Sequence, residues 1–180
     1  MIAVDTNFLI ALFDGDKFPN GTIENTLHVR AKSVCLAAKE QRVRIIIPYV
    51  ALTEYLEGVQ KPEVILESLK KDRRFTVASY DAKATLEYTH LVKSNKDFKK
   101  FGKIRNRQGL KFDAQILAIS LANNATHFCS RDEDLLSISK SCGLTPCHLD
   151  NFEIDEAFRQ LSMSFPEPTT QSLNEVYASA

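Results

Sequence analysis

Five carboxylates stand at positions where a folded chain could gather them for catalysis. Asp5 follows directly on a short apolar run, and Asp132 and Asp134 follow another, THFC. Glu54 lies shortly after the β-branched run VRIII, and Asp113 lies near the start of the apolar segment KFDAQILAISLA. An apolar run of this length before polar residues predicts a buried strand. Ligands of open α/β sheets bind at the carboxyl ends of the strands, so we expect these carboxylates to share one edge.

Each carboxylate also has a purely structural interpretation. Asp5 and Asp132 are typical N-cap residues, Asp113 could complement the positive end of its helix, and Glu54 could lie on a solvated face. Four independent placements pointing to one edge weaken that interpretation. Asp113 also shares a helix face with two leucines of the same segment, so a charge there needs a cleft, a partner or a metal.

A cluster of carboxylates would favour metal-assisted chemistry. Two unit charges about 5 Å apart repel by about 3 kcal/mol at an effective dielectric of about 20, so the cluster would hold extra protons or bind cations. Ligand sets made only of oxygen atoms favour Mg²⁺ or Mn²⁺ over zinc. Such a metal converts water into a nucleophile and stabilises a leaving oxygen. The carboxylates therefore predict hydrolysis of a phosphodiester or a phosphomonoester.

Alternating strands and helices would position these side chains. This alternation predicts an α/β fold with a central parallel sheet, flanked by helices on both faces and joined by right-handed crossovers. Strands are predicted at residues 1–4, 43–47, 74–78, 126–129 and 144–146. Helices are predicted at residues 8–13, 24–41, 48–58, 62–71, 79–95, 109–124, 132–140 and 153–163. We expect one domain over residues 1–163 and a loosely ordered C-terminal tail over residues 164–180, which contains two prolines.

The composition excludes several other classes. The 23 basic and 23 acidic side chains give no net charge, so only local clustering can indicate a nucleic-acid partner. No segment approaches the roughly 18 apolar residues of a membrane helix, and the N-terminus does not resemble a signal peptide. We therefore expect a cytoplasmic protein whose four cysteines are free thiols. The spacing of the cysteines and histidines at 127–148 fits no usual zinc site.

Four segments resemble the PIN domain, a family of small metal-dependent ribonucleases. The resemblance covers most of residues 1–146. In the second segment, Glu54 stands four residues before Gly58, and the fourth is similar to the family's T-x-D-x-D-F pattern, with Ser130 for Thr and Leu135 for Phe. The segments, in chain order, are VDTNFLI with Asp5, TEYLEG with Glu54, FDAQILAIS with Asp113, and SRDEDL with Asp132 and Asp134.

The resemblance implies a parallel sheet of about five strands and a pocket that holds one or two Mg²⁺ or Mn²⁺ ions. Asn7 and Ser130 would orient the carboxylates, as metal sites generally require. Asp134 would be an accessory metal ligand. The catalytic and metal-binding carboxylates would be Asp5, Glu54, Asp113 and Asp132.

The resemblance leaves more than one function open. Many small members are VapC-type toxins of type II toxin–antitoxin pairs, so the implied partners are RNA, an antitoxin protein and a second copy of the chain. The alternative is a non-catalytic RNA- or partner-binding module with the PIN fold. A phosphatase that uses Asp5 as its nucleophile is disfavoured, because Thr6 and Asn7 occupy the positions where a second Asp is expected.

A basic stretch leads into the Asp113 segment. Residues 93–111 contain eight basic side chains and one acid, with Phe98 and Phe101 interleaved. Cations beside an acidic pocket would bind phosphates, and the aromatic rings could stack on bases. We expect the RNA to be single-stranded or a loop, since helical RNA hides its base edges. The alternative is a solvated loop; the residues expected to bind RNA are Lys103, Arg105, Arg107 and Lys111.

Overall fold

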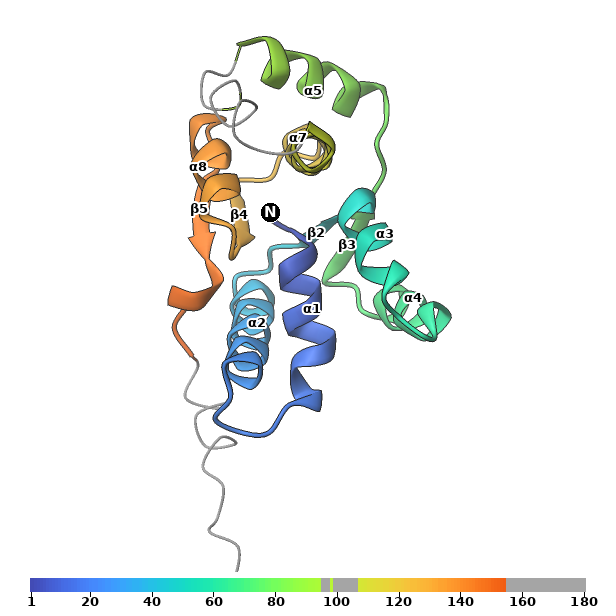
Figure 1. Cartoon of the computed structure of the whole chain (residues 1–180), viewed down its shortest axis with the longest axis vertical. Coiled ribbons are helices and arrows are strands. Elements are labelled where there is room, and N and C mark those ends of the chain that lie inside the picture. The colour runs from blue at the N-terminus through green and yellow to red at the C-terminus, as the bar shows by residue number, and fades with distance from the viewer. Residues whose placement is uncertain (95–97, 99–106, 155–180) are drawn as a thin grey trace, which may run out of the picture.

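A five-stranded parallel sheet forms the centre of the protein, with strand order β3-β2-β1-β4-β5 (Figure 1). The computed structural model describes residues 1–94, 98 and 107–154. The α/β fold and the parallel sheet predicted from the sequence are confirmed. The strands are β1 (Ile2–Val4), β2 (Ile45–Pro48), β3 (Phe75–Ala78), β4 (His127–Ser130) and β5 (Thr145–His148).

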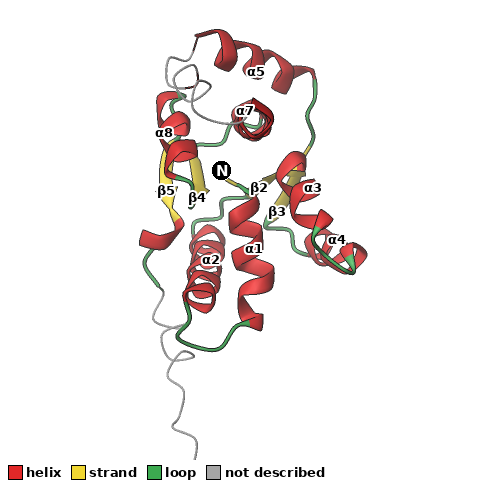
Figure 2. Ribbon diagram, in the orientation of Figure 1, coloured by secondary structure: helices red, strands yellow, loops and turns green. Residues whose placement is uncertain are grey.

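Helices surround the sheet (Figure 2). The α-helices are α1 (Thr6–Asp14), α2 (Ile23–Glu40), α3 (Tyr49–Glu57), α4 (Pro62–Lys71), α5 (Ala82–Ser94), α7 (Arg107–Ala122) and α8 (Glu133–Ser141). Two 3-10 turns, η1 (Gly15–Lys17) and η2 (Leu149–Asn151), complete the described elements. None of the described helices is long and apolar enough to cross a membrane.

The two faces of the sheet bury two separate cores. Successive strand residues point to opposite faces, so Ala3 packs in one cluster and Val4 in the other. The first cluster joins the sheet to α5, α7 and α8, and the second joins it to α1, α2 and α4. Figure 1 shows α1 and α2 on one side and α5 and α7 on the other. β1 is the central strand and is paired on both edges, so its carboxyl end is held from two sides.

Several predicted boundaries move when the tertiary structure is present. The first helix begins at Thr6 rather than Phe8, because the Asp5 side chain accepts a hydrogen bond from the Phe8 amide. The helix predicted over residues 79–95 begins three residues later, because α5 starts at Ala82 and the Asp81 carboxylate, rather than Ser79, accepts from the Ala84 amide over 2.8 Å.

Two more boundaries differ, and the end of the chain is not tested. Pro48 ends β2 instead of opening α3, whereas Gly58 ends α3 as predicted. The predicted helix after Gly109 already includes Arg107.

All four cysteines are free thiols, as expected. The helix predicted at 153–163 lies almost wholly outside the described residues and the tail at 164–180 entirely so; the domain boundary at residue 163 stays a prediction.

Candidate active site

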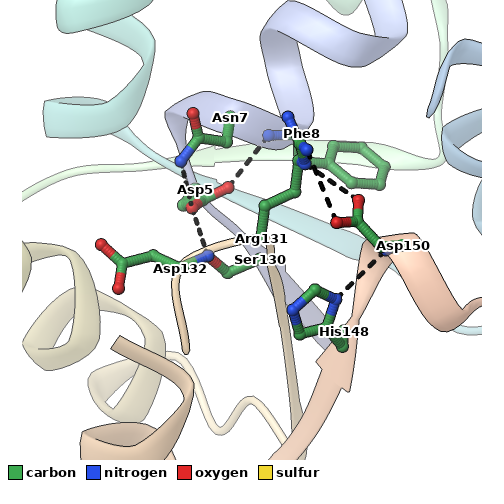
Figure 3. Close-up of polar contacts among 8 residues, drawn as sticks. All are labelled: Asp5, Asn7, Phe8, Ser130, Arg131, Asp132, His148 and Asp150. Carbon is green, nitrogen blue, oxygen red and sulfur yellow. Dashed lines mark hydrogen bonds and ion pairs between the residues drawn. The ribbon is translucent and has the colours of Figure 1, made fainter. Parts of the chain in front are cut away.

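Asp5 lies at the carboxyl end of the central strand and is 3% exposed. Its backbone is extended, with φ of −103°, and its side chain caps α1. Oδ1 accepts the Phe8 amide over 2.9 Å, and Oδ2 accepts the Ser130 hydroxyl over 2.5 Å (Figure 3). The Asn7 amide nitrogen lies 3.5 Å from the same Oδ2. Donors from two elements therefore fix the carboxylate of Asp5.

Ser130 connects Asp5 to Asp132. β4 pairs with β1 so that Val4 is opposite Cys129, which places the next residues, Asp5 and Ser130, side by side. The Ser130 hydroxyl oxygen also accepts the Asp132 amide over 2.9 Å. Asp132 caps α8 by accepting the Leu135 amide over 3.1 Å. The structure thus brings Asp5, Ser130 and Asp132 together, and both aspartates cap helices at the same time.

Glu54 joins this edge through Thr6, a residue whose role the sequence did not indicate. The Thr6 hydroxyl donates a hydrogen bond to Oε2 of Glu54, and the Ala51 carbonyl lies 3.4 Å from the same hydroxyl. Thr6 follows Asp5 directly, so one turn of backbone positions both carboxylates. The Glu54 side chain is otherwise exposed. The position of Thr6 on the face of α1 toward α3 could have indicated this contact. That signal is readable only when it is known which helices pack together.

Asp113 and Asp134 lie on the helices α7 and α8. Asp113 is half-buried on α7, which packs against α3 and β2. Asp134 is half-buried in the first turn of α8. Within residues 1–94, 98 and 107–154, no three His, Cys, Asp or Glu side chains form a group that could hold one metal ion. Convergence of four carboxylates on shared metal ions therefore stays a prediction.

Burial makes Asp5 electrostatically unusual. Desolvation raises the pKa of its carboxyl group from 3.8 to about 6, and the negative charge of Asp132 adds to this rise. The hydrogen bonds from Ser130, Phe8 and Asn7 act in the opposite direction and stabilise the charged form. At neutral pH the protein therefore holds a buried negative charge beside a second carboxylate. That arrangement attracts a cation.

The donor atoms fit magnesium or manganese better than zinc. Asp5 and Asp132 supply oxygen atoms only. Mg²⁺ usually keeps several waters and binds through one or two carboxylates rather than a full protein cage. The neighbouring carboxylates of Asp5 and Asp132 are consistent with this mode of Mg²⁺ coordination, even without a third carboxylate in the same group.

An ion pair that the sequence did not indicate borders the site. Arg131 Nε lies 2.9 Å from Oδ1 of Asp150, and Nη2 lies 3.5 Å from Oδ2. The Asp150 amide donates to Nδ1 of His148 over 3.2 Å (Figure 3). Parallel pairing of Ser130 with His148 brings these residues together. Nothing in the local sequence pattern indicates that register.

The residues expected to bind RNA are only partly described. Lys111 is exposed on α7, two positions before Asp113. Arg107 is the first residue of α7. Lys103 and Arg105 lie outside the described residues, so the role of the basic stretch stays a prediction.

Comparisons with solved structures place the fold. Eleven chains match. One belongs to the structure of VapBC2 from Rickettsia felis bound to a DNA fragment from their promoter: 18% identity, TM-score 0.53, covering 82% of this chain and 98% of the other. Another belongs to FitAB bound to an IR36 DNA fragment: 14% identity, TM-score 0.53, covering 85% and 98%. At these identities the likeness shows the fold alone.

The sequence itself gives the family. No curated protein matches the chain, but the family description "PIN domain" matches residues 2–141, which span all five carboxylates of the candidate site. A match over most of the chain is sufficient for assignment. The chain belongs to the PIN-domain family.

Proposed function

We propose that the protein is a metal-dependent endoribonuclease that hydrolyses RNA phosphodiesters at the carboxyl edge of its sheet. PIN-domain proteins are typically nucleases. The observation that carries the proposal is the buried Asp5 carboxylate, which Ser130 holds beside Asp132. Perturbed carboxylates at the carboxyl ends of parallel strands are typical of catalytic sites.

Asp5 and Asp132 would hold Mg²⁺ or Mn²⁺, with Glu54, Asp113 and Asp134 as the further carboxylates of the site. When bound, the metal supplies an activated water and stabilises charge on the leaving oxygen. The number of ions, one or two, depends on how many of these carboxylates take part.

The chain's own residues would orient this site and control its protonation. Donors from α1 and β4 hold both oxygens of Asp5, which prevents the carboxylate from rotating. Thr6 holds Glu54, and the exposed Asn7 side chain contacts Asp5. Since the pKa of Asp5 is about 6, the carboxylate carries a proton in mildly acidic solution and becomes available to a cation above that pH.

The substrate would be single-stranded or loop RNA. Lys111 is exposed on the same helix as Asp113, which suits contact with the phosphates that flank a cleaved bond. Lys103, Arg105 and Arg107 would extend this contact. Solved complexes of VapBC2 and FitAB share the fold, which supports a toxin of a type II toxin–antitoxin pair as the biological setting, with an antitoxin and a homodimer as partners.

Cleavage of a single-stranded RNA with Mg²⁺ or Mn²⁺, with and without EDTA, tests the proposal. Asp5→Asn and Asp113→Asn should each abolish cleavage while the far-ultraviolet circular dichroism spectrum is retained. Asp16→Asn is the matched control, because Asp16 is an exposed carboxylate in η1, beyond the far end of α1. Activity that survives both site substitutions, or that resists EDTA, contradicts the site assignment.

A second candidate function is a non-catalytic RNA- or partner-binding module. One observation favours it: the described residues contain no group of three potential metal ligands. RNA binding without metal-dependent cleavage in the same assay would support this module instead of the nuclease.

A further inference from the structure

A basic pocket of about 520 Å³ lies at the amino ends of β2 and β3, whereas the carboxylates of the candidate active site follow the carboxyl ends of the strands. It is lined by the C-terminal end of α2 and by the residues that immediately precede β2 and β3. Asp72 is its one acidic lining residue. The five basic residues that line it are Lys39, Arg42, Arg44, Arg73 and Arg74, and together with Asp72 they are called the basic pocket below.

Only one of these cations is neutralised within the described residues. Arg74 Nε lies 2.9 Å from both carboxylate oxygens of Asp72, and its guanidinium lies 5.8 Å from the centre of the Phe75 ring. The other four basic side chains are exposed and form no ion pair with any described residue. Like charges gathered in one hollow repel one another, so the basic pocket is suited to an anion.

Arg42 occupies a backbone conformation that disfavours its own side chain. Its φ is +54°, in the left-handed region. The Arg42 amide donates to the Lys39 carbonyl over 3.1 Å, and the Val43 amide donates to the Ala38 carbonyl over 2.9 Å. This pair of bonds is the Schellman motif, whose left-handed position is usually glycine and sometimes asparagine.

Two other helices of the protein end in the same way with the expected residues. At the end of α7 the position is Asn124, with φ of +56°, and at the end of α8 it is Gly143, with φ of +87°. An arginine in that conformation costs stability without any compensating contact among the described residues. Backbone strain of this kind is concentrated at functional sites, and here it occurs in a residue that lines a charged pocket.

We propose that the basic pocket is a second binding site for the RNA, which holds phosphates of its backbone away from the carboxylate edge. Arginine presents a planar fork of donors that matches a phosphate group, and four of the five cations are arginines. Among the described residues, only Arg74 of these four forms an ion pair. No aromatic side chain lines the basic pocket, so it lacks the rings on which successive bases usually stack. The site therefore reads phosphate and not sequence.

This inference rests on the proposed function and adds a path for its substrate. The carboxylates lie at the carboxyl ends of the strands and the basic pocket lies at the amino ends of β2 and β3. A strand of four residues separates the two edges by about 13 Å. An acidic edge repels RNA, whereas cations at the other edge hold the polymer without entering the metal site. The zero net charge of the chain conceals this separation.

Binding of a labelled single-stranded RNA to the full chain tests the inference. The titrations are carried out in EDTA at several salt concentrations, so that no cleavage is required. The triple variant Arg42→Gly, Arg44→Gln, Arg73→Gln should reduce the slope of log K against log salt by about 2, at roughly 0.7 for each single-strand phosphate that the variant no longer neutralises. Arg42→Gly alone should weaken binding while the melting temperature is unchanged or raised, since glycine favours this conformation.

Two controls separate charge from backbone effects. Asn124→Gly makes the same backbone change in the same motif without loss of charge, so RNA affinity should not change. The corresponding triple lysine variant keeps the charges and should keep the salt slope.

An unchanged salt slope in the triple variant overturns the inference, even if RNA is cleaved at the carboxylate edge. Binding of inorganic pyrophosphate is measured with the same variants. If the triple variant loses pyrophosphate binding but keeps its affinity for RNA, the inference is also overturned, because the basic pocket would then bind a free phosphate compound and not RNA. A reduced slope supports it, whether or not the protein cleaves RNA, so its failure and that of the nuclease proposal are distinguishable.

Discussion

Replacing Asp5 with asparagine should stabilise the protein at neutral pH while removing the charge that the proposed activity needs. Burial raises the pKa of Asp5 from 3.8 to about 6. A difference of about 2 between the folded and unfolded values corresponds to about 3 kcal/mol, since each pKa unit is worth about 1.4 kcal/mol. That is the cost of keeping a carboxylate charged in this position at neutral pH.

The sign of the pH dependence follows from where the proton binds. Between the two pKa values the folded state holds more protons than the unfolded state. The stability contributed by protonated Asp5 is therefore present below about pH 4 and is lost as the pH rises through about 6. The asparagine side chain of the variant does not titrate, so the stability of the variant relative to the original protein should rise by about 3 kcal/mol between about pH 4 and about pH 6 and should reach a plateau above about pH 6.

The full 3 kcal/mol is an upper value. Asparagine keeps an oxygen for the Phe8 amide, but its NH₂ group faces the Ser130 hydroxyl, which must turn to accept. This mismatch with Ser130 costs about 1–2 kcal/mol at every pH. We expect a net gain of about 1–2 kcal/mol, or roughly 2–8 °C in melting temperature for a domain of this size.

Urea and thermal unfolding in EDTA across about pH 4 to about pH 8 measures this difference. Asp16→Asn, an exposed substitution, should change stability by less than about 0.5 kcal/mol at every pH. A variant that is less stable than the original protein at neutral pH, or a difference that does not vary with pH, refutes the reasoning about buried charge.

Metal binding, Ser130 and Gly15 supply three more predictions. The affinity for Mn²⁺, measured by calorimetry, should rise with pH through about 6, because the proton on Asp5 competes with the metal. Ser130→Ala should cost about 1–3 kcal/mol in unfolding experiments and raise the Asp5 pKa seen by NMR titration, since the Asp5 carboxylate and the Asp132 amide both lose a partner. Gly15→Ala should cost about 1–3 kcal/mol, because an added Cβ would lie 2.5 Å from Cβ of His28.

Much of the fold follows from local patterns in the sequence. The β-branched run before Pro48 and the apolar run before Asp5 became β2 and β1, because buried parallel strands need little more than such runs. Pro62 and Lys71 bound α4 as predicted. The predicted start of the fifth helix at residue 79 was wrong because Ser79 and Asp81 are both good N-cap residues, and the local sequence does not decide between them.

Interactions between distant segments could not be predicted in the same way. The Thr6–Glu54 hydrogen bond depends on how α1 packs against α3, and the Arg131–Asp150 pair depends on the register of β5 beside β4. The basic pocket gathers residues from two stretches, 38–44 and 72–74, that lie far apart in the sequence. Charge clusters of this kind arise from topology and leave no periodic trace in the sequence.

The two carboxylate oxygens of Asp5 have different structural roles, and this has an evolutionary consequence. One oxygen fastens the first turn of α1, and the other receives Ser130 at the carboxylate edge. Asparagine, serine or threonine can also cap α1, but these side chains lack the negative charge that the proposed metal site requires. A single substitution at Asp5 would therefore remove the proposed nuclease activity and leave the architecture intact, so a protein that keeps the fold for binding alone lies one substitution away.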